Sequence, residues 1–166
     1  MVILLKKVSI EEKHVLRNLL ELYLYDFSQF DKCDVNSHGL FGYKYLDHYW
    51  TEPGRHPYFI MVNGNLAGFV LVNDFCYLCK PGEARSVSEF FVMKKYRRIG
   101  VGEAAARKVF DLFPGKWEIV QHPENKPSME FWEKIVSEIT RGQYRKLEAV
   151  TEDWIGQALI FSSNKI

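Results

Sequence analysis

The sequence has neither a large charge excess nor a long apolar run. Its 166 residues include 22 Lys and Arg against 21 Asp and Glu, a net charge of +1. A protein that binds nucleic acid or an acidic membrane over a broad surface carries a larger basic excess, so we expect neither partner. No apolar run approaches the roughly 18 residues of a transmembrane helix. The N-terminus places its lysines after a very short apolar run, opposite to a secretory signal, and we expect a cytoplasmic protein.

Cysteine is also scarce. The chain has three, Cys33, Cys76 and Cys79, and an odd number without a secretory signal favours free thiols. Cys76 and Cys79 have the spacing of half a zinc site, but the sequence has no second such pair and no nearby His to complete four ligands. We therefore expect no metal and interpret both cysteines as small apolar side chains near a strand end.

Two common phosphate-binding motifs are missing as well, the glycine fingerprint of dinucleotide-binding folds and the P-loop. In their place, a basic turn over 94–98 precedes two close glycines, Gly100 and Gly102. The apolar pattern predicts a strand over 85–92 before this turn and a helix over 100–113 after it. The first amides of a helix have no partner within it and attract anions, and glycines allow close approach to the backbone. The stretch predicts a pyrophosphate site; the alternative is an ordinary basic turn.

The spacing Arg97-x-x-Gly100-x-Gly102 resembles the acyl-CoA pyrophosphate loop of the GNAT superfamily of N-acyltransferases. A second segment, Asn125 to Trp132, is similar to the family pattern Asn-x-x-Ala-x-x-Leu-Tyr, with Ser128 at the small position. Asn125 can cap the following helix and still offer its amide to the pantetheine arm. The resemblance implies acetyl-CoA as cosubstrate. It also implies these cofactor-binding residues: Phe91, Val92, Arg97, Arg98, Ile99, Gly100, Val101, Gly102, Asn125, Ser128 and Trp132.

Trp132 departs from the family pattern, which has a tyrosine there that can protonate the departing CoA thiolate. An indole N–H donates hydrogen bonds but is not a useful acid. Three alternatives stay open. Trp132 hydrogen-bonds the thiolate or merely packs in the core, Tyr144 on the next segment acts as the acid, or no acid is needed. No acid is needed if the CoA thiolate is already a fair leaving group, as a thiol pKa near ~8.5 indicates.

Two residues are candidates for the general base that deprotonates the acceptor amine. Glu89 lies on the strand expected beside the thioester, and its alternative role is a strand carboxylate paired with Lys or Arg. His122 follows an expected strand over 117–121, at the end where α/β sheets tend to hold ligands. Its pKa is intrinsically near the working range, and its alternative role is a surface loop residue. The N–H of Phe91 or Val92 is the candidate donor that polarises the thioester carbonyl.

The order of predicted elements is mixed rather than regular. Ser9 and Glu12 predict a capping box ahead of a helix over 10–28, a shorter helix is expected over 43–50, and Asn63-Gly64 predicts a hairpin turn. Strands and helices alternate only in the second half of the chain. We therefore expect a mixed α/β sheet. The order is also the order of GNAT proteins, and the resemblance implies a GNAT-like mixed, mostly antiparallel central sheet of about six or seven strands, flanked by helices on both faces.

The length predicts one domain over residues 1–166, and the resemblance implies that it is an acetyltransferase domain, which we expect to be a monomer or homodimer. The expected reaction moves an acetyl group from acetyl-CoA directly to a primary amine of a small molecule or peptide, without metal. In the family the acceptor pocket is walled by the region that corresponds to 22–57. Aromatic and acidic residues there suit a cationic amine, or simply an aromatic core edge with a solvated acidic face. An acyl-CoA-binding sensor or scaffold is the alternative function, and Trp132 at the family's tyrosine position is the feature that keeps this alternative open.

Overall fold

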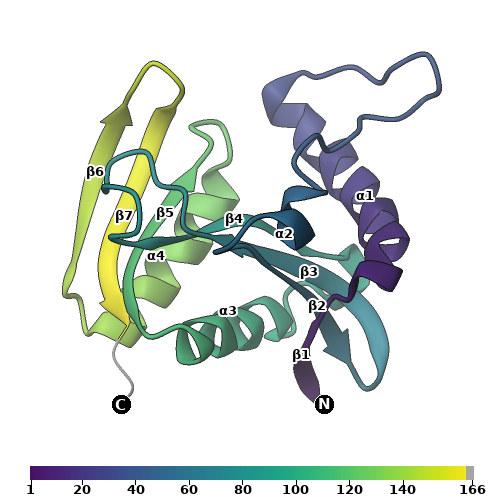
Figure 1. Ribbon diagram of the computed structural model, residues 1–166. Coiled ribbons are helices and arrows are strands. Elements are labelled where there is room, and N and C mark those ends of the chain that lie inside the picture. Colours follow the sequence, from purple (N-terminus) through teal and green to yellow (C-terminus); the bar gives the residue numbers. More distant parts are fainter. Residues whose placement is uncertain (164–166) are drawn as a thin grey trace.

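The computed structural model describes residues 1–163, with a seven-stranded sheet between layers of helices (Figure 1). The strand order is β1-β2-β3-β4-β5-β7-β6, and all neighbouring pairs except β4 and β5 are antiparallel. The predicted fold class is confirmed. Residues 164–166 of the expected domain lie outside the described residues. The strands are β1 (Ile3–Lys7), β2 (His56–Val62), β3 (Asn65–Asn73), β4 (Arg85–Val92), β5 (Gly115–Gln121), β6 (Tyr144–Val150) and β7 (Ile155–Ser163).

Helices α1 and α2 cover one face of the sheet, and α3 and α4 cover the other (Figure 1). Ser9 and Glu12 form the predicted capping box at the short 3₁₀ turn that leads into α1. No helix within residues 1–163 is long and apolar enough to cross a membrane. The α-helices of this part of the chain are α1 (Lys13–Asp31), α2 (His48–Thr51), α3 (Val101–Leu112) and α4 (Lys126–Thr140).

The helix predicted over 43–50 is confirmed only at its end, where α2 begins. The N–H groups of Leu46, His48 and Tyr49 bond to carbonyls three residues earlier, which is the 3₁₀ pattern. Leu46 and Tyr49 are both buried. Both side chains face the core, and the hydrogen bonds show that the segment forms successive turns instead of an α-helix.

Strands β4 and β5 run parallel but pair only near their beginnings. The last paired residues are Ser86 on β4 and Glu118 on β5. Just beyond them, Ser88 is an extra residue in β4, because its two neighbours pair with consecutive residues of β3. Such a bulge bends the strand and increases its twist. Within residues 1–163 no strand pairs with this edge of β4 after Ser86, so its backbone is available to a ligand.

Candidate active site

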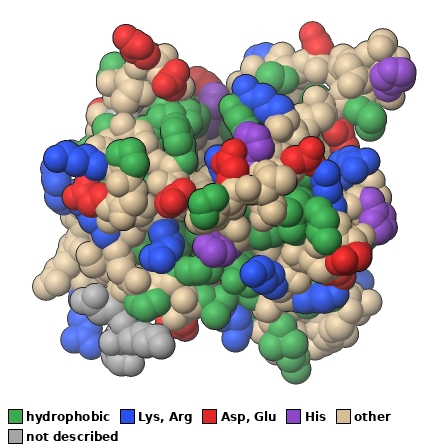
Figure 2. Space-filling model, viewed as in Figure 1, with side chains coloured by type: hydrophobic (Ala, Val, Ile, Leu, Met, Phe, Trp, Pro, Cys, Tyr) green, Lys and Arg blue, Asp and Glu red, His purple; other side chains and the backbone are tan. Residues whose placement is uncertain are grey.

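A cavity of about 730 Å³ opens where β4 and β5 separate. Figure 2 shows a notch at the top of the molecule, between the α1 side and the arm of β5, β7 and β6. The cavity is lined by Glu89 of β4 and by side chains from α1, the segment after α1, the β3–β4 loop, the end of β5, α4 and the β6–β7 turn. Residues far apart in the sequence therefore converge on Glu89.

Glu89 lies between two tyrosines in this cavity. The Tyr23 hydroxyl on α1 donates a hydrogen bond of 2.5 Å to Glu89 Oε2, and the Tyr43 hydroxyl donates one of 3.1 Å to Oε1. Burial raises the pKa of the Glu89 carboxyl group to about 7, although both hydrogen bonds act to lower it. Burial and the nearby carboxylate raise the pKa of Tyr23, which therefore stays protonated as a donor. Glu89 can thus exchange a proton near neutral pH, as a general base must.

His122, the second candidate base, lines the same cavity beside Glu89. Its ring lies against Phe27 and Trp154, with centroid separations of 5.6 Å and 6.3 Å. His122 Nδ1 accepts a hydrogen bond of 3.2 Å from the Glu124 N–H, so the proton of the neutral ring is on Nε2. This tautomer can donate a hydrogen bond to a ligand but has no free lone pair. The geometry favours Glu89 as the base.

The turn after β4 has the backbone geometry expected of an anion site. Arg98 and Gly100 have left-handed backbones, with φ of 62° and 85°, and Gly100 is the N-cap of α3. A Cβ at Gly100 would meet no atom within 4 Å, so open space lies beside the unpaired first amides of the helix. Ile99 is exposed and Val101 is buried. Val101 can therefore offer a ligand only its backbone.

The other glycine of the motif also has a packing role. A Cβ at Gly102 would lie 3.2 Å from the ring of Phe131 on α4, so the missing side chain lets α3 and α4 approach. On β4, Phe91 packs in the layer beneath α1, and Val92 packs against α3 on the opposite face. Their side chains belong to the core, and only their backbones can contact a cofactor.

Arg97 is placed differently from the expectation that it supplies charge to a phosphate. Its Nε donates a hydrogen bond of 2.6 Å to the Val92 carbonyl, and its guanidinium pairs with Asp26 of α1. The Asp26 carboxylate neutralises the charge of Arg97, so the Arg97 side chain links the turn to β4 and to α1 and has no charge left over for a phosphate. Arg98 makes no ion pair within residues 1–163 and is the better candidate to meet a phosphate.

The start of α4 presents the three residues predicted for it to the cavity: Asn125, Ser128 and Trp132. Asn125 Oδ1 accepts a hydrogen bond of 3.2 Å from the Ser128 N–H, so the predicted cap is confirmed. Trp132 is 4% exposed and lies edge-to-face against Phe90 at 5.0 Å between ring centroids. Core packing, one of the open alternatives, accounts for these contacts.

The structure does not bring Tyr144 to this cavity. Its hydroxyl donates a hydrogen bond of 3.0 Å to Glu133, and its ring lines a separate depression with Lys116 and Arg141. The reason is the strand order, because β7 lies between β6 and β5. Tyr144 is therefore not positioned to protonate a thiolate beside Glu89.

Several cavity residues were not identified from the sequence. The predicted acceptor region contributes Tyr23, Tyr43 and others, but Phe75, Tyr77 and Trp154 also line the cavity and lie outside it. The only sequence signal for Phe75 and Tyr77 is the presence of rings in an otherwise polar loop. The cysteines are free thiols, as predicted. No cluster of three His, Cys, Asp or Glu residues suited to a metal occurs among residues 1–163.

Comparison with known proteins agrees with this geometry. The model of the acetyltransferase (GNAT) family matches residues 17–136, more than half of the chain. The chain belongs to the GNAT family. No curated protein sequence matches it. Both sequence motifs that resemble the family, the turn at Arg97–Gly102 and the segment from Asn125 to Trp132, fall within the matched residues.

Solved structures share the GNAT fold at low sequence identity. An acetyltransferase from Thermus thermophilus has a TM-score of 0.70 and 11% identity, over 98% of this chain and 97% of that one. The aminoglycoside acetyltransferase AAC(6')-Ib, in complex with coenzyme A, has a TM-score of 0.67 and 14% identity, over 97% and 95%. A spermidine N-acetyltransferase from Vibrio cholerae, in complex with CoA and spermine, has a TM-score of 0.65 and 11% identity, over 97% and 95%. At these identities the likeness establishes the fold alone.

Proposed function

We propose that this GNAT protein transfers an acetyl group from acetyl-CoA to a primary amine of a small molecule or peptide, with Glu89 as the general base. The observation that carries the proposal is the Glu89 carboxyl group itself, which has a pKa of about 7 and lies between Tyr23 and Tyr43. A structural carboxylate is more simply paired with Lys or Arg. Glu89 has no such ion pair within residues 1–163.

Acetyl-CoA would lie along the open edge of β4. The first amides of α3 and Arg98 would hold its pyrophosphate, because they border open space at Gly100. Asn125 and Ser128 would contact the pantetheine arm from the start of α4. The thioester carbonyl would accept a hydrogen bond from the N–H of Phe91 or Val92, which would stabilise the negative charge that develops on it.

The reaction then needs one base and no separate acid. The amine arrives as an ammonium ion, and the Glu89 carboxylate takes one proton directly or through water. The free nitrogen attacks the thioester carbon, the C–S bond breaks with CoA leaving as the thiolate, and the nitrogen's second proton then passes to the released thiolate or to water. Trp132 is not an acid and Tyr144 lies elsewhere, which favours the alternative in which the thiolate leaves unassisted.

Other proteins of this fold support the proposed chemistry, since the two named neighbours crystallised with CoA include one bound to spermine. We also propose that residues 1–166 form one domain, which the alignments over 97–98% of the chain support. The chain is proposed to act in the cytoplasm as a monomer or homodimer.

The test is calorimetric titration of acetyl-CoA into the protein, with thiol release followed across a panel of amines. Binding together with amine-dependent thiol release supports the transferase. Binding without release from any amine supports the alternative, a CoA-binding sensor, and overturns the transferase. An absence of binding overturns both.

A further inference from the structure

A group of aromatic rings, the distal wall, stands across the cavity from α1. It consists of Phe75 and Tyr77 from the β3–β4 loop and Trp154 from the β6–β7 turn, all of which line the cavity. The Tyr77 and Trp154 rings are stacked, with 5.6 Å between centroids and 26° between planes, and Phe75 lies edge-on to Tyr77 at 5.2 Å. Two loops that are far apart in the sequence thus form one continuous wall.

Glu118 of β5 holds the β3–β4 loop, which carries two rings of the distal wall, by hydrogen bonds to its backbone. The Glu118 side chain is 1% exposed and accepts three successive backbone N–H groups, those of Tyr77, Leu78 and Cys79, at 2.6, 3.0 and 2.8 Å. Hydrogen bonds to a charged acceptor are among the stronger ones in proteins. The β3–β4 loop is therefore held in one place, and Tyr77 is a fixed part of the cavity rather than a freely moving surface ring.

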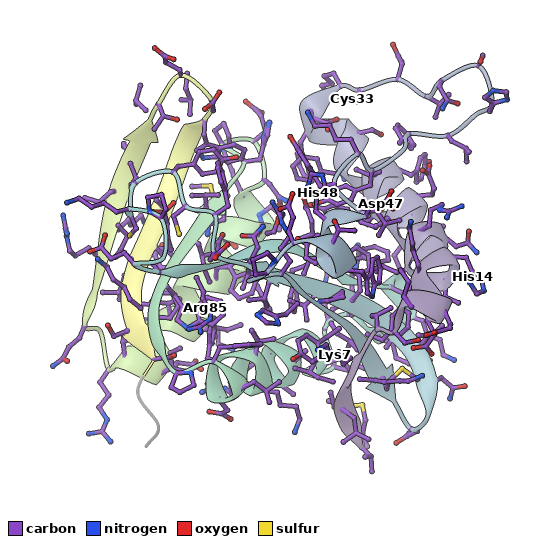
Figure 3. All side chains as sticks on the ribbon, in the orientation of Figure 1. Lys7, His14, Cys33, Asp47, His48 and Arg85 are labelled. Carbon is purple, nitrogen blue, oxygen red and sulfur yellow. The ribbon has the colours of Figure 1, made fainter. Side chains whose placement is uncertain are left out.

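The charges around the cavity mouth are mostly negative. Asp153 lines it beside Trp154, and Asp31 lines it from the last turn of α1, close to the position where Figure 3 labels Cys33. Within residues 1–163 neither aspartate makes an ion pair with Lys, Arg or His. Among residues 1–163, Arg55 is the one Lys or Arg that lines the cavity, and its Nε lies 2.8 Å from a Glu52 carboxylate oxygen, which neutralises it. Figure 2 shows acidic side chains at the tip of the β6–β7 arm, beside the notch.

Tyr77 lines the same cavity as the proposed base, Glu89, and Asp153 of the acidic rim. Burial raises the pKa of its hydroxyl, and the negative charges of Glu89 and Asp153 raise it further. The hydroxyl is therefore within electrostatic reach of both carboxylates. A chain molecule in the cavity would have Glu89, the distal wall and Asp153 all within the lining that surrounds it.

A buried amide gives independent support for a nitrogen-rich ligand. Gln121, at the end of β5, is 3% exposed and lines the cavity. Its Nε2 bonds to the Ile119 carbonyl, but its Oε1 has no hydrogen-bond partner among the described residues. Buried carbonyl oxygens without a partner are uncommon in native proteins. An N–H group of a ligand in the cavity would supply the missing partner.

We propose that the acceptor carries a second cationic group, which the distal wall and Asp153 hold while Glu89 receives the reacting amine. Aromatic faces attract ammonium groups, and the unpaired Asp153 carboxylate supplies the opposite charge. This inference rests on the proposed acetyl transfer and specifies the substrate class of the same site, a linear diamine or polyamine type of cation. A flat neutral aromatic amine would use the rings but would leave Asp153 without a partner.

The first test compares amines that differ only in the second charge. Putrescine is paired with butylamine and cadaverine with pentylamine, and kcat/KM is measured for each by thiol release from acetyl-CoA. We expect each diamine to be preferred by roughly tenfold, since a cation–π contact and an exposed ion pair each contribute up to about fivefold. After correction for the two equivalent amines of the diamine, a ratio below about twofold would overturn the inference.

The second test uses the variant Asp153→Asn with Glu152→Gln as its matched control. Both remove one negative charge from the β6–β7 turn, but only Asp153 lines the cavity. Asp153→Asn should lower the diamine-to-monoamine ratio by roughly two- to fivefold, and Glu152→Gln should leave the ratio unchanged. An equal fall in both variants would mean that the general field of the turn, and not a specific contact, selects the charge, and would overturn the role of Asp153.

The two proposals fail in different ways. If the monoamines are acetylated as well as the diamines, acetyl transfer stands and the dicationic acceptor is refuted. If acetyl-CoA binds but no amine of any class is acetylated, the transferase itself is refuted, and the inference about its acceptor is refuted with it.

Discussion

The substitution Glu89→Gln should make the folded protein more stable than the wild type at alkaline pH. In the native state burial raises the pKa of Glu89 from its ordinary value of 4.5 to about 7. Between these two pH values the folded state keeps a proton that the unfolded state releases, so rising pH favours unfolding. The stability contributed by the protonated group is complete below about pH 4.5 and is lost as the pH rises through 7. Glutamine has no proton to lose, and its amide oxygen can still accept from Tyr23.

The size of the effect follows from the same pKa values. Each pKa unit corresponds to about 1.4 kcal/mol, and titration of this one group lowers the wild-type stability by about 2.5 kcal/mol between pH 5 and pH 8. The free energy of unfolding of Glu89→Gln minus that of the wild type should rise by this amount over the interval. Other titrating groups cancel in the difference.

Urea denaturation of both proteins at pH 5 and pH 8 measures this difference. Equal slopes against denaturant would show that both unfold to the same extent, so that the free energies can be subtracted. A difference that stays constant between the two pH values would show that the Glu89 pKa is not raised, and would refute the physical basis for its role as a base.

Three further predictions follow from the same contacts. The kcat/KM for acetyl transfer should rise with pH up to about 7, as Glu89 loses its proton; initial rates measured between pH 5 and 8 check this, and a flat profile contradicts it. Glu118→Gln should raise the KM for the acceptor several-fold and leave the KM for acetyl-CoA unchanged, because it replaces an acceptor of three N–H groups. Glu83→Gln, an exposed residue within the β3–β4 loop that Glu118 holds, is the control, and equal effects would argue against a positioning role. Gly68→Ala should unfold the protein or cost more than about 3 kcal/mol in denaturation, since its Cβ would lie 1.9 Å from the Phe91 carbonyl oxygen; wild-type stability would contradict this packing.

Features encoded by neighbouring residues were predictable from the sequence. The start of α3 at the Gly100 turn and the cap at Asn125 depend on residues within one turn, and the structure has both where they were predicted. The helix over 43–50 shows the limit of this approach, because buried residues three apart, such as Leu46 and Tyr49, fit an α-helix as well as the tighter turns that the segment forms. Local pattern alone does not distinguish these windings.

Contacts between distant segments were not predictable in this way. Tyr23 is 66 residues from Glu89 in the sequence, and Asp26 is 71 residues from Arg97. The Tyr23 contact supplies one of the hydroxyl donors to the proposed base. The Asp26 contact gives Arg97, which was predicted to bind phosphate, a structural role instead. Both depend on how α1 packs across β4, which becomes known only when the whole sheet is assembled. The sequence could therefore suggest Glu89 as a base but not the tyrosines that hold it.

The most direct test of the central claim follows the acetyl group itself. Acetyl-CoA labelled in its acetyl group is incubated with a primary amine, a diamine included, and either the wild-type protein or Glu89→Gln, after titration has shown that both bind acetyl-CoA equally. We predict that the label moves to the amine nitrogen with the wild type, and at least about 100-fold more slowly with Glu89→Gln, as expected for loss of a general base. Label that stays on CoA with the wild type, or transfer at equal rates by the two proteins, would contradict the account.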